Sequence, residues 1–287
     1  MPTIHPKDEN PYFIDAESAA EMARLVQQGQ MLTKGMGGLL PAQVDPSEIH
    51  DVLDIGCGPG GWVRDVAFAY PEMEITGIDL AALIVEYAQA MAKVHRVENA
   101  SFVVMDALKP LEFPDNSFDF VNGRFLFGFM SKETWPQLIK ECIRILRPGG
   151  MLRLTECEAP QSNSAASEQL YGKVSESLYK SGRSFSPDGM HVGMVPMLAP
   201  LLREAGFQHV QATAHALDCS AGQEAWDAFY QDFRAGMKLL LPFFVKLGLT
   251  TEEEYEVIYQ QALADMLGDD FCCIWLYVSV LGQKPVE

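Results

Sequence analysis

The sequence lacks an excess of basic residues, which limits the partners that the protein can have. Its 287 residues include 39 acidic and 21 basic side chains, giving a formal net charge of −18. A surface of that charge repels phosphate backbones and anionic lipid headgroups. We find no local cluster of lysine and arginine that would offset the repulsion. Nucleic acid is therefore not an expected partner.

The sequence also lacks apolar runs long enough to span a membrane. The two longest are FCCIWLYVSVL at 271–281 and LLLPFFVKLGL at 239–249, whereas a spanning helix needs about 20 residues. The first residues, MPTIHPKDENPYF, contain no apolar stretch of the kind found in secretory signals. We therefore expect a cytoplasmic protein with no membrane partner.

Cysteine motifs for metal binding are absent too. None of the six cysteines belongs to a CxxC pair. Cys272 and Cys273 are adjacent, so they would point to opposite faces of a strand and could not share a metal. We expect reduced, buried thiols and no metal site.

What the sequence does contain is a regular alternation of strand-like and helix-like segments. The β-rich runs are 51–56, 73–79, 101–106, 118–123 and 151–157, and the helical stretches between them are 62–70, 80–96 and 132–146. This spacing predicts βαβ units, and hence a parallel sheet with helices on both faces. Right-handed crossovers then place the loops after the strands along one carboxyl edge, where open α/β sheets bind ligands.

The segment VLDIGCGPGG at 52–61 follows the first predicted strand and is rich in glycine. Gly56, Gly58 and Gly61 fit G-x-G-x-x-G, the motif of dinucleotide-binding loops. Phosphates bind helix N-termini, but a carboxylate such as Asp54 in the preceding strand would repel a pyrophosphate. S-adenosylmethionine carries an ammonium, a sulfonium and one carboxylate, so Asp54 would attract it. Asp54 therefore favours the sulfonium cofactor over a dinucleotide.

VLDIGCGPGG resembles motif I of the class I S-adenosylmethionine-dependent methyltransferases. Three later segments resemble the family in order and spacing: GIDLA at 77–81, VVMDALKPLEFPDNSFDFV at 103–121 and LRPGGMLRLTE at 146–156. The resemblance implies a Rossmann-like fold, S-adenosylmethionine as cofactor with S-adenosylhomocysteine as product, and an enzyme of EC 2.1.1 type.

The resemblance also implies contacts with the cofactor. Asp79 would bind both ribose hydroxyls, Asp106 the adenine amino group, and the backbone amide of Ala107 the adenine N1. Arg124 could hold the cofactor carboxylate or a substrate acid, or form a structural salt bridge. The predicted cofactor-binding residues are Asp54, Gly56, Gly58, Gly60, Asp79, Leu80, Asp106, Ala107 and Arg124, with Met31 and Thr33 as contacts from an N-terminal lid.

The alternation lapses after residue 157, where we expect a helical segment, a strand at 208–219 and a last strand at 271–282. The fold class is then α/β, a doubly wound, mostly parallel seven-stranded sheet with helical insertions. The predicted division is an N-terminal helical lid (1–50), a cofactor-binding core (51–157), a lid insertion (158–195), a core helix and strand (196–220), a helical insertion (221–270) and a last core strand (271–287).

The segments outside the sheet are rich in methionine and aromatic residues, which suits an apolar or aromatic ligand as well as plain helix packing. Tyr12, Tyr171 and Tyr179 are candidate substrate contacts. NGRFLFGFM at 122–130 resembles a segment of small-molecule methyltransferases but has Phe129 where those often carry histidine. His191, in a loop marked by glycine and proline, is therefore the candidate catalytic base.

These observations predict methyl transfer from S-adenosylmethionine to O, N or C of a small hydrophobic or aromatic metabolite. Two alternatives stay open from the residues. The literal glycine motif suits an NAD(P)-dependent oxidoreductase, and a methyltransferase-like protein could bind the cofactor without transferring a methyl group.

Overall fold

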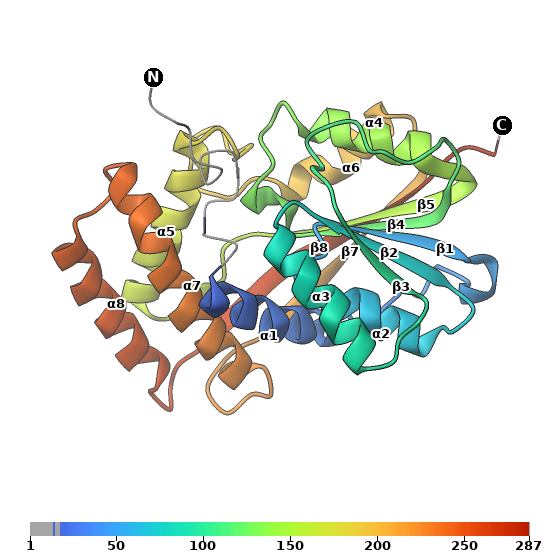
Figure 1. Cartoon of the computed structure of the whole chain (residues 1–287). Coiled ribbons are helices and arrows are strands. Elements are labelled where there is room, and N and C mark those ends of the chain that lie inside the picture. Colours follow the sequence, from blue (N-terminus) through green and yellow to red (C-terminus); the bar gives the residue numbers. More distant parts are fainter. Residues whose placement is uncertain (1–13, 15–17, 287) are drawn as a thin grey trace, which may run out of the picture.

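The structure is a computed structural model that describes residue 14 and residues 18–286. Five parallel strands form most of its sheet: β1 (Asp51–Ile55), β2 (Glu74–Asp79), β3 (Ala100–Val104), β4 (Phe118–Arg124) and β5 (Leu146–Cys157). They lie in the order β3-β2-β1-β4-β5 (Figure 1). β1 sits between β2 and β4, so the loop that follows it lies at the centre of the carboxyl edge.

Helices cover both faces of this sheet, as the alternation predicts. On one face α2 (Gly61–Ala69) and α3 (Ala82–Val94) pack against Val52 and Phe120, and on the other α4 (Trp135–Ile145) and α6 (Val195–Glu204) pack against Leu53 and Val121. Strands buried on both faces read as continuous apolar runs. That is why DVLDI and FDFVNG are so apolar, and why their few polar residues stand out.

The sheet is completed by antiparallel pairing at its far end. β8 (Cys273–Gln283) runs antiparallel between β5 and β7 (Gln208–Asp218). A two-residue strand, β6 (Gln161–Ser162), pairs with the start of β8 and brings the total to eight strands rather than the seven expected. Residues 147–150 lie inside β5, where the register shifts between the pairs Phe118–Leu146 and Phe120–Met151.

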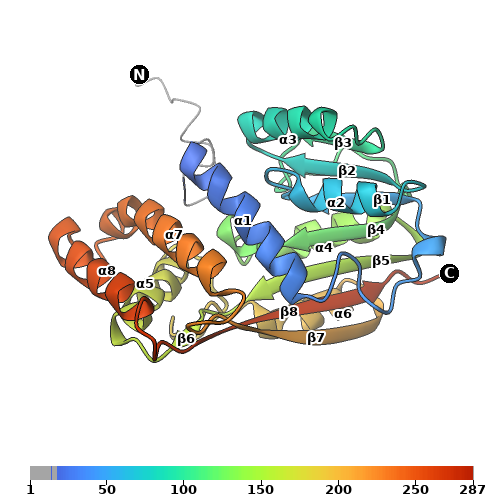
Figure 2. The same cartoon turned by 90° about the horizontal axis from the view of Figure 1, so that it is seen from below.

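A second apolar core lies beyond the carboxyl edge. It is built by α5 (Ala165–Lys180), α7 (Trp226–Lys246) and α8 (Glu252–Met266), joined by Met31 and Leu32 of α1 (Ala19–Gly35). Figure 2 shows these helices grouped at one end of the sheet, with α1 between the group and α2. Segments from both predicted insertions thus form one helical layer. None of the helices in the described part of the chain is long and apolar enough to cross a membrane.

Five of the six cysteines are buried, as expected, and all six are free. Cys272 is the exception, because it lies in the loop before β8 and is exposed to solvent. Among the residues that the structure describes, no group of three histidine, cysteine or acidic side chains is placed to hold a metal ion.

Candidate active site

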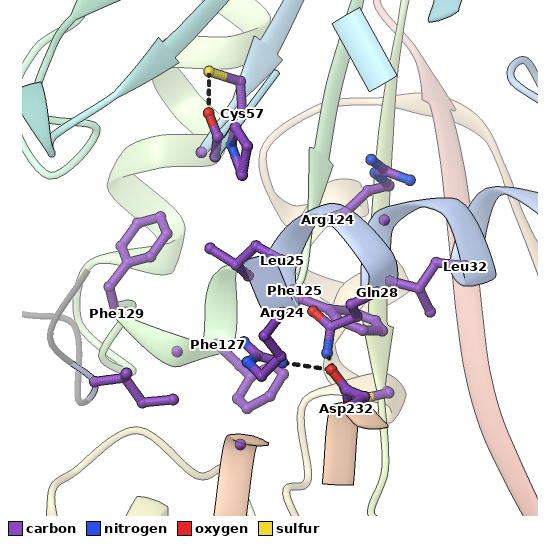
Figure 3. A pocket seen from close by; sticks show the side chains of 18 of the residues that line it. Arg24, Leu25, Gln28, Leu32, Cys57, Arg124, Phe125, Phe127, Phe129 and Asp232 are labelled. Carbon is purple, nitrogen blue, oxygen red and sulfur yellow. Dashed lines mark hydrogen bonds and ion pairs between the residues drawn. The ribbon is translucent and has the colours of Figure 1, made fainter. Parts of the chain in front are cut away.

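A cavity of about 270 Å³ lies where the carboxyl edge of the sheet meets the helical layer (Figure 3). The loops after β1, β2, β3, β4 and β5 form one side of it, and α1, α5 and α7 form the other. The cavity is thus built by segments from almost the whole length of the described chain.

The glycine loop turns sharply from β1 into α2 along one wall of the cavity. Gly56, Gly58 and Gly60 all have positive φ angles, of 63°, 52° and 71°. At Gly60 a Cβ atom would lie 2.4 Å from the Phe102 ring, so no larger residue fits there. Gly56 and Gly58 line the cavity, whereas Gly60 lies behind them and shapes the turn.

Three predicted cofactor contacts after β2 and β3 also line the cavity. The two carboxylate oxygens of Asp79 accept hydrogen bonds of 3.0 Å from the amides of Gly58 and Ala81, and these bonds oppose the rise of its pKa that burial causes. Asp79 therefore ties the glycine loop to the end of β2. Asp106 accepts a 2.9 Å bond from the amide of Leu108, and Ala107 lies beside it.

Asp54 is the first member of a buried polar row that crosses three strands. Asn122 of β4 donates its amide to Asp54 at 2.6 Å, and Arg153 of β5 donates Nε to the Asn122 oxygen at 2.7 Å. The three residues are register neighbours on β1, β4 and β5. Burial raises the pKa of Asp54 to about 6, although Arg124, Asn122 and Arg153 pull it down.

Arg153 is held from several sides. Its Nη1 donates to the Leu39 carbonyl at 2.9 Å, and its guanidinium lies over the rings of Trp62 and Phe120. Burial lowers its pKa to about 9. Neither Asn122 nor Arg153 is identified by sequence reasoning. The available indication is that each of the apolar runs DVLDI, FDFVNG and MLRLTE is interrupted by a polar residue, at Asp54, Asn122 and Arg153.

Arg124 lies at the end of β4, between Asp54 and α1. Its Nη1 donates to the Thr33 hydroxyl at 3.1 Å, and its guanidinium is 5.9 Å from the centre of the Trp62 ring. Thr33 thus reaches the site through Arg124 and does not itself line the cavity. Met31 is buried in the helical core and does not line it either, whereas Leu80 does.

The other half of the cavity is walled by aromatic rings. They are Phe125 and Phe127 after β4, Tyr171 of α5, Phe233 of α7 and Trp275 of β8, while Phe129 lies against Gly56 of the glycine loop. Phe125 has a left-handed backbone with φ at 56°, a strained conformation for a bulky residue. Its ring centre lies 5.6 Å from that of Trp275 and 6.1 Å from that of Phe127.

A buried carboxylate holds the backbone of this aromatic turn. Glu156 of β5 accepts a 2.7 Å hydrogen bond from the amide of Leu126, and the amide of Phe125 bonds to the Thr155 carbonyl. Burial raises the pKa of Glu156 to about 8. Two adjacent residues of β5, Thr155 and Glu156, therefore hold the backbone of this turn.

Charged side chains also reach the aromatic half. Arg24 of α1 donates hydrogen bonds to Glu21 at 2.7 Å and to Asp232 of α7 at 2.8 Å. The second bond joins α1 to α7 on their side of the cavity. Glu158, after β5, accepts hydrogen bonds from the amides of Val192 and Gly193, both at 2.9 Å. Burial raises the pKa of both Asp232 and Glu158.

The predicted catalytic and substrate residues are not all brought to the cavity. Tyr171 lines it. His191 does not, because its loop is anchored by Glu158 at the next two residues and leaves the His191 side chain in solvent. Tyr179 is exposed on the far end of α5, against Gly189 and Lys132, and also lies away from it. Tyr12 lies outside the described residues.

Comparison with known proteins finds methyltransferases similar to this chain. Residues 52–150 match a family described as a methyltransferase domain. The chain is 27% identical over 266 residues to the methyltransferase pytC of Aspergillus terreus, which covers 86% of this chain and 75% of that protein. It is 28% identical over 183 residues to demethylmenaquinone methyltransferase of Listeria monocytogenes, covering 60% of this chain and 75% of the relative.

The fold has a counterpart among solved structures. Phosphoethanolamine N-methyltransferase 2 of Haemonchus contortus, solved with phosphomonomethylethanolamine and S-adenosylhomocysteine, matches with a TM-score of 0.50 at 19% identity. The match covers 82% of this chain and about half of that one (49%). The family model and the two sequence relatives are described as methyltransferases, which favours the S-adenosylmethionine interpretation of the glycine loop over the dinucleotide one.

Proposed function

We propose that this chain is a class I S-adenosylmethionine-dependent methyltransferase of EC 2.1.1 type, and that it methylates a small hydrophobic or aromatic metabolite in the cytoplasm. The observation that carries the proposal is the division of the cavity. One half is walled by the glycine loop, Asp79 and Asp106, and the other by five aromatic side chains.

The chemistry of the first half fits the cofactor. Asp54 and Arg124 offer opposite charges to the ammonium and carboxylate of its methionine end, and neither carries an ion pair to the other residues described. Asp79 faces the ribose, and Asp106 with the amide of Ala107 the adenine. Gly56 and Gly58 allow close backbone approach, while Gly60 shapes the loop and Leu80 adds apolar contact. When bound, S-adenosylmethionine supplies an electrophilic methyl group.

The helical layer would close the site. We assign residues 51–157, 196–220 and 271–287 to the core, and residues 1–50, 158–195 and 221–270 to a lid. The support is that α1, α5 and α7 wall the cavity opposite the sheet, and that Arg24 of α1 bridges to Asp232 of α7. Met31 packs α1 into the helical layer, and the Thr33 hydroxyl joins α1 to Arg124. Both residues therefore affect the cofactor by fixing the position of α1.

The contribution of this chain to the reaction is alignment in a site from which water is excluded. An in-line displacement gains much of its acceleration when the reacting atoms are held in contact and solvent is kept out. The strained turn at Phe125 places aromatic side chains at the carboxyl end of β4, next to Trp275 near the start of β8. Tyr171 is the substrate contact that we carry forward.

The proposal is tested first by binding. S-adenosylhomocysteine at 100 times its Kd should stabilise the protein by about 2.7 kcal/mol in a thermal or denaturant titration, while NADH should have no effect. Turnover with an acceptor library, followed as S-adenosylhomocysteine release, then separates methyl transfer from cofactor binding alone. Stabilisation by NADH but not by S-adenosylhomocysteine would refute the proposal.

A further inference from the structure

Asp232 lines the cavity, and one of its carboxylate oxygens has few contacts among the residues that the structure describes. Its Oδ1 accepts the 2.8 Å bond from Arg24, whereas the one contact of its Oδ2 with these residues is with the amide of Gln28, at 3.4 Å. That contact is longer than an ordinary hydrogen bond. Figure 3 shows Arg24 and Gln28 reaching Asp232 from α1. Oδ2 therefore keeps capacity to accept a hydrogen bond from a ligand.

Tyr171 places a second polar atom in the same half of the cavity. Its ring meets that of Phe233, the residue next to Asp232, edge-on at 5.7 Å, and its hydroxyl has no hydrogen bond to any residue that the structure describes. Burial raises the pKa of Tyr171, and Cys273 and Asp232 raise it further, so the phenol stays neutral. The aromatic half of the cavity thus offers a ligand one carboxylate oxygen, from Asp232, and one hydroxyl, from Tyr171.

The charges around the cavity disfavour an anionic acceptor. Among the described residues that line it, the acids are Asp54, Asp79, Asp106, Glu158 and Asp232, and the cations are Arg24 and Arg124. Arg24 is engaged by Glu21 and Asp232, and Arg124 lies at the cofactor half. A carboxylate or phosphate acceptor would be repelled by these acids, and neither arginine would be left to pair with it.

The aromatic walls favour the opposite charge. A cation near the faces of Phe, Tyr and Trp rings is attracted by the negative charge that the ring quadrupole places there. The ring centre of Phe125 lies 6.1 Å from that of Phe127 and 5.6 Å from that of Trp275, on the side of the cavity formed by β4 and β8. An ammonium group on an apolar body would satisfy both the rings and the carboxylate.

We infer, taking the proposed function as the premise, that the acceptor is an amine carried on an aromatic or apolar body, and that Asp232 binds and deprotonates it, with the Tyr171 hydroxyl as a second hydrogen-bond partner. Asp232 is then a catalytic residue in place of His191. Arg24 and Gln28 are positioning residues, because they hold the carboxylate without touching the acceptor.

The proton and electron balance is simple. The bound ammonium gives one proton to Asp232 Oδ2, which frees its lone pair. The nitrogen forms its bond to the methyl carbon as the carbon–sulfur bond breaks, and that electron pair stays on sulfur as the thioether. The product leaves as a methylated ammonium, and Asp232 returns its proton to water. A sulfonium and an ammonium thus yield a thioether, a methylated ammonium and one proton.

The first test compares matched acceptors. Sets of an amine, an alcohol and a carboxylic acid on the same one-, two- and three-ring aromatic bodies are assayed for S-adenosylhomocysteine release. We expect turnover among the amines and less than a hundredth of that rate in the matched alcohols and acids. Turnover confined to alcohols or acids, or no turnover of any amine by protein that binds S-adenosylhomocysteine, overturns the inference. Failure to bind S-adenosylhomocysteine would instead refute the proposed function.

The second test uses Asp232→Asn, which keeps the shape of the side chain, against Asp227→Asn, which removes an exposed acid from the same helix. For Asp232→Asn we expect kcat for the amine to fall at least 100-fold. Calorimetry on the S-adenosylhomocysteine complex should show amine affinity at least tenfold weaker, with S-adenosylhomocysteine binding changed less than twofold. Asp227→Asn should match wild type in all three. An Asp232→Asn protein that keeps more than a tenth of kcat overturns the inference.

The contact assigned to Tyr171 is tested by removing only its hydroxyl. Tyr171→Phe removes only the hydroxyl, so it is suited to a case in which Asp232→Asn does not fold. We expect KM for the amine to rise about tenfold while kcat changes less than threefold, since the proton acceptor remains. An unchanged KM in Tyr171→Phe contradicts the assigned contact.

Discussion

Asn122 donates its amide to Asp54 at 2.6 Å, between residues that face each other in register on β4 and β1. The orientation of that amide is set from the other side, since its oxygen accepts Nε of Arg153 at 2.7 Å. The second oxygen of Asp54 is thereby left for the cavity. A row of three side chains fixes the acid that we assign to the cofactor ammonium.

Replacing Arg153 should weaken cofactor binding indirectly, because Arg153 orients Asn122 and Asn122 orients Asp54. Arg153→Met removes the bonds to Asn122 and to the Leu39 carbonyl, so we expect about tenfold weaker S-adenosylhomocysteine binding by calorimetry and a loss of about 2 to 4 kcal/mol in the free energy of unfolding. Arg144→Met is the matched control, because Arg144 bonds two carbonyls and two acids far from the cavity. It should lose stability and keep normal affinity.

The pKa of Asp54, about 6 in the free protein, predicts a pH dependence of cofactor binding. The carboxylate must be ionised to hold an ammonium, so affinity should fall as the pH drops below about 6. We expect the Kd for S-adenosylhomocysteine to be about tenfold higher at pH 5 than at pH 7.5, measured by calorimetry. Asp54→Asn should bind weakly at both pH values; a variant that retained the wild-type pH dependence would show that another group causes it.

The two glycines at the start of α2 provide a paired test of the loop. Gly60→Ala places a Cβ atom 2.4 Å from the Phe102 ring at a φ of 71°, so we expect a loss of about 2 to 4 kcal/mol in the free energy of unfolding, together with weaker cofactor binding. At the next position, Gly61, a Cβ meets nothing within 4 Å and the residue is helical. Gly61→Ala should be neutral or about 0.5 kcal/mol more stable in urea titrations.

The strands and helices of residues 51–157 follow from the sequence because their periodicity is local. The run 73–79 becomes β2 and the run 80–96 contains α3, with boundaries that move by one or two residues. The glycine loop and Asp79 are recognisable for the same reason, since the spacing of a loop and the strand before it is contained in one short segment.

What the sequence does not predict depends on contacts between distant segments. The row of Asp54, Asn122 and Arg153 exists only through the register of three strands. Asp232 joins the cavity only because α7 packs on α1, some 200 residues earlier in the chain. The prediction of His191 as the base rests on its place in a loop near the ligand edge. Its loop does reach the cavity through Val192, but the imidazole itself faces solvent.

The carboxyl group of Glu156 should make the stability of the protein depend on pH. Burial raises its pKa from 4.5 to about 8, so the folded state holds the proton more tightly than the unfolded chain. The sign follows from linkage: this group stabilises the fold fully below pH 4.5, and the contribution is lost as the pH rises through about 8. We expect the free energy of unfolding to fall by on the order of 3 kcal/mol between pH 5.5 and 8.5 on account of this group.

Glu156→Gln isolates that effect, because glutamine cannot ionise and its carbonyl oxygen can still accept the bond from the amide of Leu126. Urea titrations at pH 5.5 and 8.5 should show a much smaller difference for the variant than for wild type, with the variant the more stable of the two at pH 8.5. Because the same carboxyl group holds the turn that carries Phe125 and Phe127, ionisation should also loosen the aromatic half of the cavity. KM for the acceptor in wild type should then rise above pH 8, and Glu156→Gln should remove that rise. Equal pH dependence in the two proteins would mean that Glu156 is not the group that titrates.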